Sequence, residues 1–151
     1  MKKIILFFIA FSFTGLLGAQ NKGPVHFSFN HLALSVKDVN RSVAFYTTVM
    51  GLQEITNRSA IEGIRWISFG EGKELHLISV LKEEVKLNKA IHLALSTANI
   101  DAFVKLLDEK KIAYSDWLGK PNTVNIRADG IKQVYLQDPD GYWIEINNAG
   151  Q

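Results

Sequence analysis

Short segments of alternating apolar and polar residues run through the chain, and a period of two predicts half-buried strands. Besides two copies of HLALS, the predicted strands lie at residues 52–59, 64–70, 73–79, 123–129, 131–138 and 142–147. Two longer segments, 36–51 and 97–112, space their apolar residues three or four apart, which predicts amphipathic helices. Asp38 suits the N-cap of the first helix, and Gly51 lies where a C-terminal glycine is expected.

The pentapeptide HLALS begins at His31 and again at His92, and each copy precedes one predicted helix. Three predicted strands follow the helix in both halves, so each half reads strand–helix–strand–strand–strand. The final turns also correspond, with Gly72 in the first half and Gly141 in the second. We therefore expect an α+β fold of two tandem βαβββ modules. The modules lie at about residues 27–82 and 88–148.

The first residues have the layout of a secretory signal peptide. A short cationic start precedes an apolar run at residues 4–17, and small residues follow before Gln20. This run is short for a membrane span of about 20 residues. An uncleaved membrane anchor is the alternative. Cleavage after Ala19, which removes residues 1–19, leaves residues 20–151 as a single periplasmic or secreted domain with no membrane partner.

Charge and composition narrow the range of partners. Lysine and arginine total 17 against 15 for aspartate and glutamate, and loss of Lys2 and Lys3 with the signal peptide leaves 15 of each. No basic stripe remains that favours nucleic acid. The chain has no cysteine, which excludes disulfides, a thiolate nucleophile and cysteine metal ligands. A small molecule is the expected partner.

Three of the four histidines lie at positions that correspond between the two halves: His31 corresponds to His92, and His76 corresponds to Glu145. His31 and His92 begin the HLALS strands, whereas His76 and Glu145 each lie four residues after the glycine of a final turn. Because side chains alternate along a strand, these four residues point away from the apolar face of their strands. If the modules pack with pseudo-twofold symmetry, the four converge on one point. His26 has no equivalent in the repeat, and we assign it no role.

Three imidazoles and one carboxylate suit a divalent metal ion such as Zn, Ni, Co, Mn or Fe. A single strand histidine is more often a structural or surface residue than a ligand, so the hypothesis rests on the joint placement of all four. Trp66 and Trp143 are expected to line the adjoining substrate pocket. Trp143 lies two positions before Glu145 and therefore shares its face of the strand.

Two motifs resemble the vicinal oxygen chelate superfamily, which includes glyoxalase I, epimerases, extradiol dioxygenases and antibiotic-resistance proteins. QDPDGYWIEI, at residues 137–146, is similar to the hairpin that leads into the last strand of that family, and FYTTVMGL, at residues 45–52, is similar to its first helix. The resemblance covers residues 27–148 and implies two curved mixed sheets around a metal-binding cleft. The ligand positions of the family map onto His31, His76, His92 and Glu145.

The resemblance implies a metal-dependent lyase or isomerase of the glyoxalase or epimerase type, acting on a small oxygenated substrate that chelates the metal. Glu145 is then the one evident carboxylate for catalysis, because His76 stands where glyoxalase I carries a second carboxylate. One alternative is an Fe(II)-dependent extradiol-type dioxygenase with His31, His92 and Glu145 as ligands. Another is a metal-free protein that binds or sequesters small molecules such as antibiotics. The ligands come either from one chain or from two subunits of a homodimer.

Overall fold

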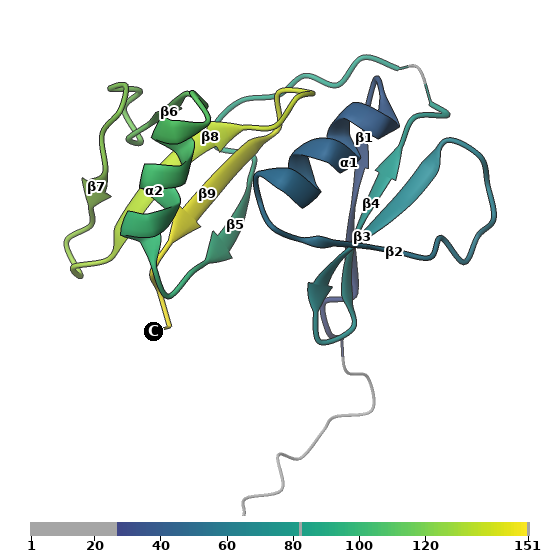
Figure 1. Cartoon of the computed structure of the whole chain (residues 1–151), viewed down its shortest axis with the longest axis horizontal. Coiled ribbons are helices and arrows are strands. Elements are labelled where there is room, and N and C mark those ends of the chain that lie inside the picture. The colour runs from purple at the N-terminus through teal and green to yellow at the C-terminus, as the bar shows by residue number, and fades with distance from the viewer. Residues whose placement is uncertain (1–26, 82, 151) are drawn as a thin grey trace, which may run out of the picture.

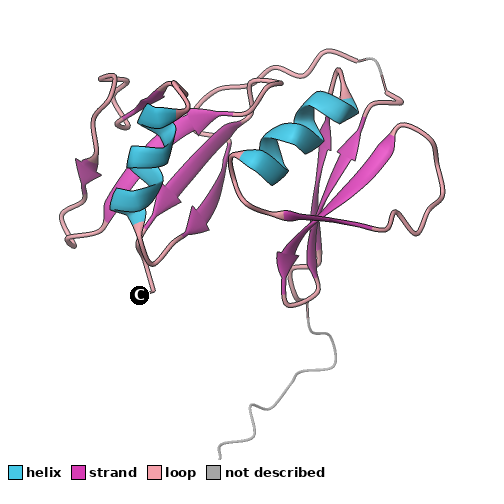
Figure 2. Ribbon diagram, viewed as in Figure 1, coloured by secondary structure: helices cyan, strands magenta, loops and turns pink. Residues whose placement is uncertain are grey.

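The computed structural model describes residues 27–81 and 83–150, and the predicted signal peptide lies outside these residues. The described part contains two helices and two mixed sheets (Figure 1, Figure 2). None of its helices is long and apolar enough to cross a membrane. The elements are β1 (His31–Ser35), α1 (Val39–Thr48), β2 (Gln53–Ile55), β3 (Ile64–Gly70), β4 (Lys73–Ile78), β5 (His92–Ser96), α2 (Ile100–Glu109), β6 (Tyr114–Ser115), β7 (Asn125–Ile126), β8 (Lys132–Gln137) and β9 (Trp143–Asn147).

The first module forms a four-stranded sheet in the order β1-β4-β3-β2. β1 runs parallel to β4, and the other neighbours are antiparallel. The carboxylate of Asp38 caps α1 by accepting hydrogen bonds from the backbone N–H groups of Asn40 and Arg41. The helix ends at Thr48, and Gly51 follows three residues later with a φ of +66°, a conformation that favours glycine. The predicted N-cap is confirmed, whereas the helix ends slightly earlier than the glycine indicated.

The second module repeats this arrangement in the order β5-β9-β8-β6, with β7 also paired to β8. β5 runs parallel to β9, as β1 runs parallel to β4. The predicted α+β fold of two tandem modules is therefore confirmed. Two details of the second module differ from the prediction. First, the strand predicted at residues 123–129 is shortened to the two residues of β7. Second, the place that β2 has at the edge of the first sheet is occupied in the second sheet by β6, which was not predicted because two residues are too few to show an alternating pattern.

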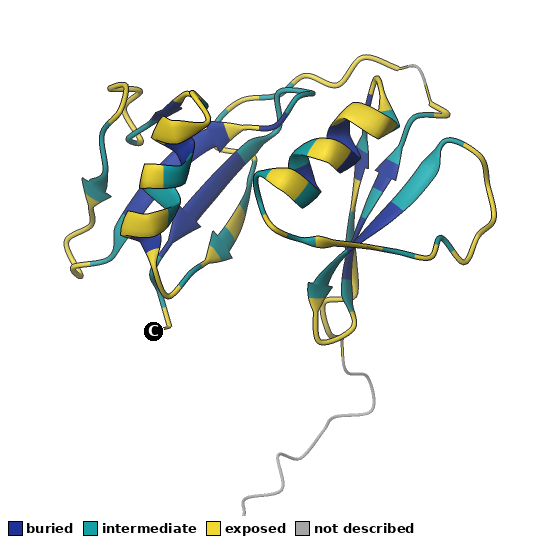
Figure 3. Cartoon of the chain, viewed as in Figure 1, coloured by how far each residue is buried: buried dark blue, intermediate teal, exposed yellow. Residues whose placement is uncertain are grey.

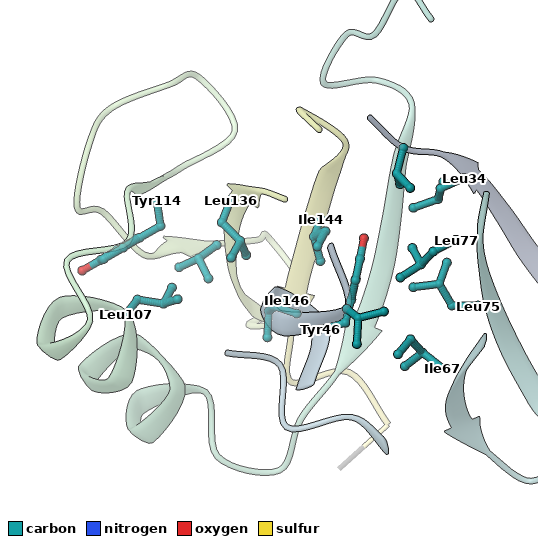
Figure 4. Packing of buried hydrophobic residues seen from close by; sticks show 13 residues of the cluster. Leu34, Tyr46, Ile67, Leu75, Leu77, Leu107, Tyr114, Leu136, Ile144 and Ile146 are labelled. Atoms are coloured by element: carbon teal, nitrogen blue, oxygen red, sulfur yellow. The ribbon is translucent and has the colours of Figure 1, made fainter. Parts of the chain in front are cut away.

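Each helix covers one face of its own sheet, and the buried residues lie between the helix and that face (Figure 3). Val43 and Tyr46 of α1 belong to the same cluster as Leu75 and Leu77 of β4, and Leu107 of α2 belongs to it with residues of β8 and β9. Figure 4 shows these side chains as one continuous cluster across both modules. The opposite face of each sheet carries the predicted metal ligands.

Helix α1 also joins the first module to the loop between β8 and β9. The hydroxyl of Tyr46 donates to Asp138 at 2.9 Å, and the hydroxyl of Ser42 donates to Asp140 at 2.6 Å. Tyr46 and Ser42 are fully buried. Both aspartates belong to the motif QDPDGYWIEI at residues 137–146. These two hydrogen bonds therefore join the helix of the first module to the last hairpin of the second.

Candidate metal centre

The first pair of predicted ligands lies on the first sheet, on the face that α1 does not cover. His31 of β1 and His76 of β4 stack with their ring centroids 4.2 Å apart and an interplanar angle of 11°. The two strands are adjacent and parallel, and Ala33 is the register partner of His76. Because side chains alternate, His31 and Ala33 share one face of β1. The fold thus places both imidazoles together at this face.

The second pair lies on the second sheet. Nε2 of His92, on β5, is 3.3 Å from Oε2 of Glu145, on β9. Ala94 is the register partner of Glu145, just as Ala33 is the register partner of His76. His76 and Glu145 therefore occupy structurally equivalent positions in the two modules.

The four residues do not meet within one chain. Across the described residues, no group of three or more histidine, aspartate or glutamate side chains is placed to hold a metal ion. The two pairs lie on different sheets, since β1 and β4 belong to the first sheet and β5 and β9 to the second. Helix α1 lies on the side of the first sheet toward the second module (Figure 1). The expected convergence of all four residues is therefore absent from the single chain.

Hydrogen bonds determine which ring nitrogen of each histidine is free. The Nδ1–H of His92 donates to the backbone carbonyl of Lys89 at 2.9 Å, and the Nδ1–H of His31 donates to Oδ1 of Asn30 at 2.7 Å. Because a carbonyl oxygen only accepts, each neutral ring keeps a free lone pair on Nε2. A hydrogen bond at the far nitrogen is the usual support of a metal-binding imidazole. His31 and His92 thus have the same hydrogen-bond support for binding a metal through Nε2.

His76 differs, because its Nε2 donates to Oε2 of Glu74 at 2.9 Å. Glu74 also accepts a hydrogen bond from Arg58 at 2.6 Å, and the bonds from His76 and Arg58 lower the pKa of the Glu74 carboxyl. Glu74 is a second carboxylate on this face, which the prediction of Glu145 as the one evident carboxylate missed. The sequence could have indicated it, because Glu74 lies two positions before His76 and residues two apart on a strand point to the same side.

Both carboxylate oxygens of the buried Glu145 accept a hydrogen bond from a neighbouring side chain. The hydroxyl of Tyr135, on β8, donates to Oε2 at 2.5 Å, and the side-chain amide of Asn147 donates to Oε1 at 2.8 Å. Burial, the hydrogen bond to Glu145 and the charge of Glu145 raise the pKa of Tyr135. The phenol therefore keeps its proton at neutral pH and remains a donor to the carboxylate.

The two tryptophans predicted to line a pocket play different parts. Trp66 is buried and stacks on His76, with ring centroids 4.2 Å apart and an interplanar angle of 3°, so it braces the imidazole. Its Nε1 is the one buried side-chain nitrogen or oxygen of the described residues without a hydrogen-bond partner. Trp143 is half-buried in register with His92, and Nζ of Lys89 lies 4.5 Å from its ring centroid. Trp143 lines a mainly apolar cavity of ≈ 440 Å³ between β1 and β5.

The second pair has the geometry of two ligands of one divalent ion. Bonds of about 2.0–2.2 Å at tetrahedral angles place two donor atoms about 3.4 Å apart, and Nε2 of His92 lies 3.3 Å from Oε2 of Glu145. A charge-assisted hydrogen bond is shorter, about 2.7–2.9 Å. An ion placed between the two atoms could bind both of them at ordinary bond lengths. The donor set therefore fits a metal ion, with coordination positions left for further ligands.

The chain is similar to known proteins over most of its length. Residues 28–146 match the family model of the Glyoxalase/Bleomycin resistance protein/Dioxygenase superfamily. The chain is 29% identical over 135 residues to Glyoxylase I 4 of Arabidopsis thaliana, with 83% of this chain and 74% of that protein covered. It is 29% identical over 133 residues to the metallothiol transferase FosB of Staphylococcus epidermidis, with 81% and 82% covered. A glyoxalase/dioxygenase structure from Nostoc punctiforme is 26% identical with a TM-score of 0.63, covering 82% of this chain and 92% of that chain.

Proposed function

Since the chain belongs to the Glyoxalase/Bleomycin resistance protein/Dioxygenase superfamily, we propose that it is an exported, metal-dependent enzyme of the glyoxalase or epimerase type. Its substrate is a small oxygenated molecule that binds the metal through oxygen. The observation that carries the proposal is the pair formed by His92 and Glu145, in which Nε2 of the imidazole lies 3.3 Å from Oε2 of the carboxylate while Nδ1 donates to a backbone carbonyl.

In this proposal the ion is Zn, Ni, Co, Mn or Fe, and when bound it acts as a Lewis acid toward the substrate oxygens. Glu145 serves as a ligand and as the catalytic carboxylate, held by its two hydrogen-bond donors. The cavity beside Trp143 takes the apolar part of the substrate. The residues that hold the ion are His31, His76, His92 and Glu145.

We further propose that a complete centre forms between two chains of a homodimer. The two pairs lie on different sheets of one chain, so the first sheet of one protomer would face the second sheet of its partner. His31, Ala33 and Ala94 are exposed on these faces, which leaves room for a second chain. A twofold axis would create two equivalent centres in each dimer.

A second candidate is the Fe(II)-dependent extradiol-type dioxygenase. It uses two histidines and one glutamate and leaves the other coordination positions open. The observation that favours it is the bond from Nε2 of His76 to Glu74, whereas Nε2 is the free nitrogen of His31 and His92. In this reading His31, His92 and Glu145 are the ligands, and His76 is a neighbour of the centre.

Metal content tests the proposal. We expect plasma mass spectrometry of the exported protein, chelated and reloaded with single metals, to find about one divalent ion per chain. His92→Ala and Glu145→Ala should each abolish this binding because each removes one of the two facing ligands, whereas the control His26→Ala should retain it. N-terminal sequencing of the same material should begin at Gln20.

Retention of the metal by Glu145→Ala would contradict the assignment of that ligand. If the wild-type protein takes up no metal after reloading, the proposal of a metal-dependent enzyme is contradicted, and the metal-free binding protein is favoured instead. His76→Ala separates the two enzyme candidates. Loss of the ion supports four protein ligands, and retention of Fe(II) supports three.

A further inference from the structure

We propose that Tyr135 is a positioning residue of the metal centre, one that turns Oε2 of Glu145 toward Nε2 of His92. This inference rests on the proposed metal site and assigns a role that neither the internal repeat nor the family motifs indicate. It is carried by three contacts of Tyr135, with Gln133, Glu145 and His92.

The first two contacts fix the direction in which the phenol donates its proton. Nε2 of Gln133 donates to the hydroxyl oxygen of Tyr135 at 3.1 Å, and that hydroxyl donates to Oε2 of Glu145 at 2.5 Å. Gln133, Tyr135 and Glu145 are all buried, so water does not compete for these groups. The hydroxyl oxygen already accepts from the amide, and the carboxylate can only accept. The donor chain therefore runs from Gln133 through Tyr135 to Glu145.

The third contact links the same residue to the other ligand. The ring of Tyr135 meets the imidazole of His92 edge to face, with centroids 5.6 Å apart and an interplanar angle of 88°. Tyr135 is also the register partner of Glu145 on the adjacent antiparallel strand, where side chains of partners lie on the same face. One side chain thus touches both members of the pair. It restrains the carboxylate through its hydroxyl and the imidazole through its ring.

The first module shows what the equivalent position does without a hydroxyl. Trp66 is the register partner of His76, as Tyr135 is of Glu145, and it braces that ligand by stacking alone. Stacking limits the tilt of a ring, but it does not select one atom to face the metal. A carboxylate has two equivalent oxygens, and only a directed donor distinguishes them. For this reason a hydroxyl matters at Tyr135.

The test removes the hydroxyl and keeps the ring. We expect Tyr135→Phe to weaken Co²⁺ binding by about 10–100-fold, the usual effect of losing an outer partner of a metal ligand, and to shift the visible absorption bands of bound Co²⁺. Tyr114→Phe is the matched control, because it also removes a buried tyrosine hydroxyl that donates to a carboxylate, Asp108, away from the centre. Its Co²⁺ affinity and spectrum should equal those of the wild type.

Unchanged Co²⁺ affinity and spectrum in Tyr135→Phe would overturn the positioning role and leave the metal site standing. Absence of Co²⁺ binding by the wild type would overturn both proposals, so the two failures are distinguishable. If Tyr135→Phe does not fold, Gln133→Leu tests the same donor chain, since it frees the phenol to rotate away from Glu145. A smaller loss of affinity with a shifted Co²⁺ spectrum is then expected, and an unshifted spectrum overturns the proposal.

Discussion

The ammonium group of Lys89 donates to three oxygens of residues 115–117. They are Oγ of Ser115 at 3.1 Å, the carbonyl of Asp116 at 2.9 Å and the carbonyl of Trp117 at 3.2 Å. The backbone carbonyl of the same lysine accepts from Nδ1 of His92. Trp117 in turn lies edge to face with His92, with ring centroids 6.3 Å apart. A single residue between the modules therefore supports His92 from the backbone and holds the loop that flanks it.

Replacement of Lys89 by Met keeps the apolar stem and removes the three donors. We expect Lys89→Met to lower the free energy of unfolding by about 1 kcal/mol, because the lysine is only half-buried and water replaces part of each lost bond. Hydrogen exchange at residues 115–118 should become faster. Lys86→Met, at an exposed lysine of the same segment, is the control for loss of charge. Equal exchange rates in the two variants would contradict the role of Lys89.

At the scale of elements, α1 and the β8–β9 loop are joined through a buried carboxylate. Burial raises the pKa of Asp138, and the hydrogen bonds from Tyr46 and from the backbone N–H groups of Asp140 and Tyr142 offset only part of this effect. In the unfolded chain an aspartate has a pKa of about 3.9. The folded protein therefore holds the proton of Asp138 more tightly than the unfolded chain does.

This difference makes the stability contribution of Asp138 depend on pH. The contribution is fully present below the unfolded pKa and is lost as the pH rises through the folded pKa. Asp138→Asn removes the titration. We expect the free energy of unfolding of the wild type, minus that of Asp138→Asn, to decrease as the pH rises above about 4, as measured by urea denaturation. A difference that grows with pH would show that the carboxylate is better stabilised than its burial implies.

The sequence predicted the elements whose patterns are long and local. β3 matches its predicted bounds, and both helices lie within their predicted segments, because apolar periodicity over five or more residues is a strong signal. The repeat also identified His76 and Glu145 as equivalent, which the strand registers confirm. The arrangement of the modules could not be predicted from the sequence, because it involves contacts between distant residues, such as the hydrogen bond from Tyr46 to Asp138, 92 positions later in the chain. The brace on Glu145 was missed for a similar reason, since the partner of Tyr135 depends on strand register.

At the scale of the whole molecule, the centre proposed between two chains would combine one half from each protomer. A variant in His31 damages only the first half, and a variant in Glu145 damages only the second. In a mixed dimer of the two variants, one centre would carry both changes and the other would carry neither. Such a dimer therefore retains one intact centre.

Mixing the two inactive proteins tests this arrangement. After unfolding and refolding together, equal amounts of His31→Ala and Glu145→Ala should recover about a quarter of the wild-type metal content, because half of randomly formed twofold dimers are mixed and each has one intact centre. Each variant refolded alone is the control and should recover none. No recovery in the mixture, while the wild type binds metal, would place all ligands of a centre in one chain.

Contacts between distant parts of the chain complete the core. Tyr46 in the first helix is fully buried, yet the acceptor for its hydroxyl is Asp138. The hydroxyl of Tyr142 reaches back 107 positions to the backbone carbonyl of Ser35. Folds that depend on such pairings form slowly, since a long stretch of chain must be ordered before the contact is gained. A polypeptide emerging from the ribosome gains these contacts only after its last hairpin has been synthesised, and such late folding is compatible with the proposed export.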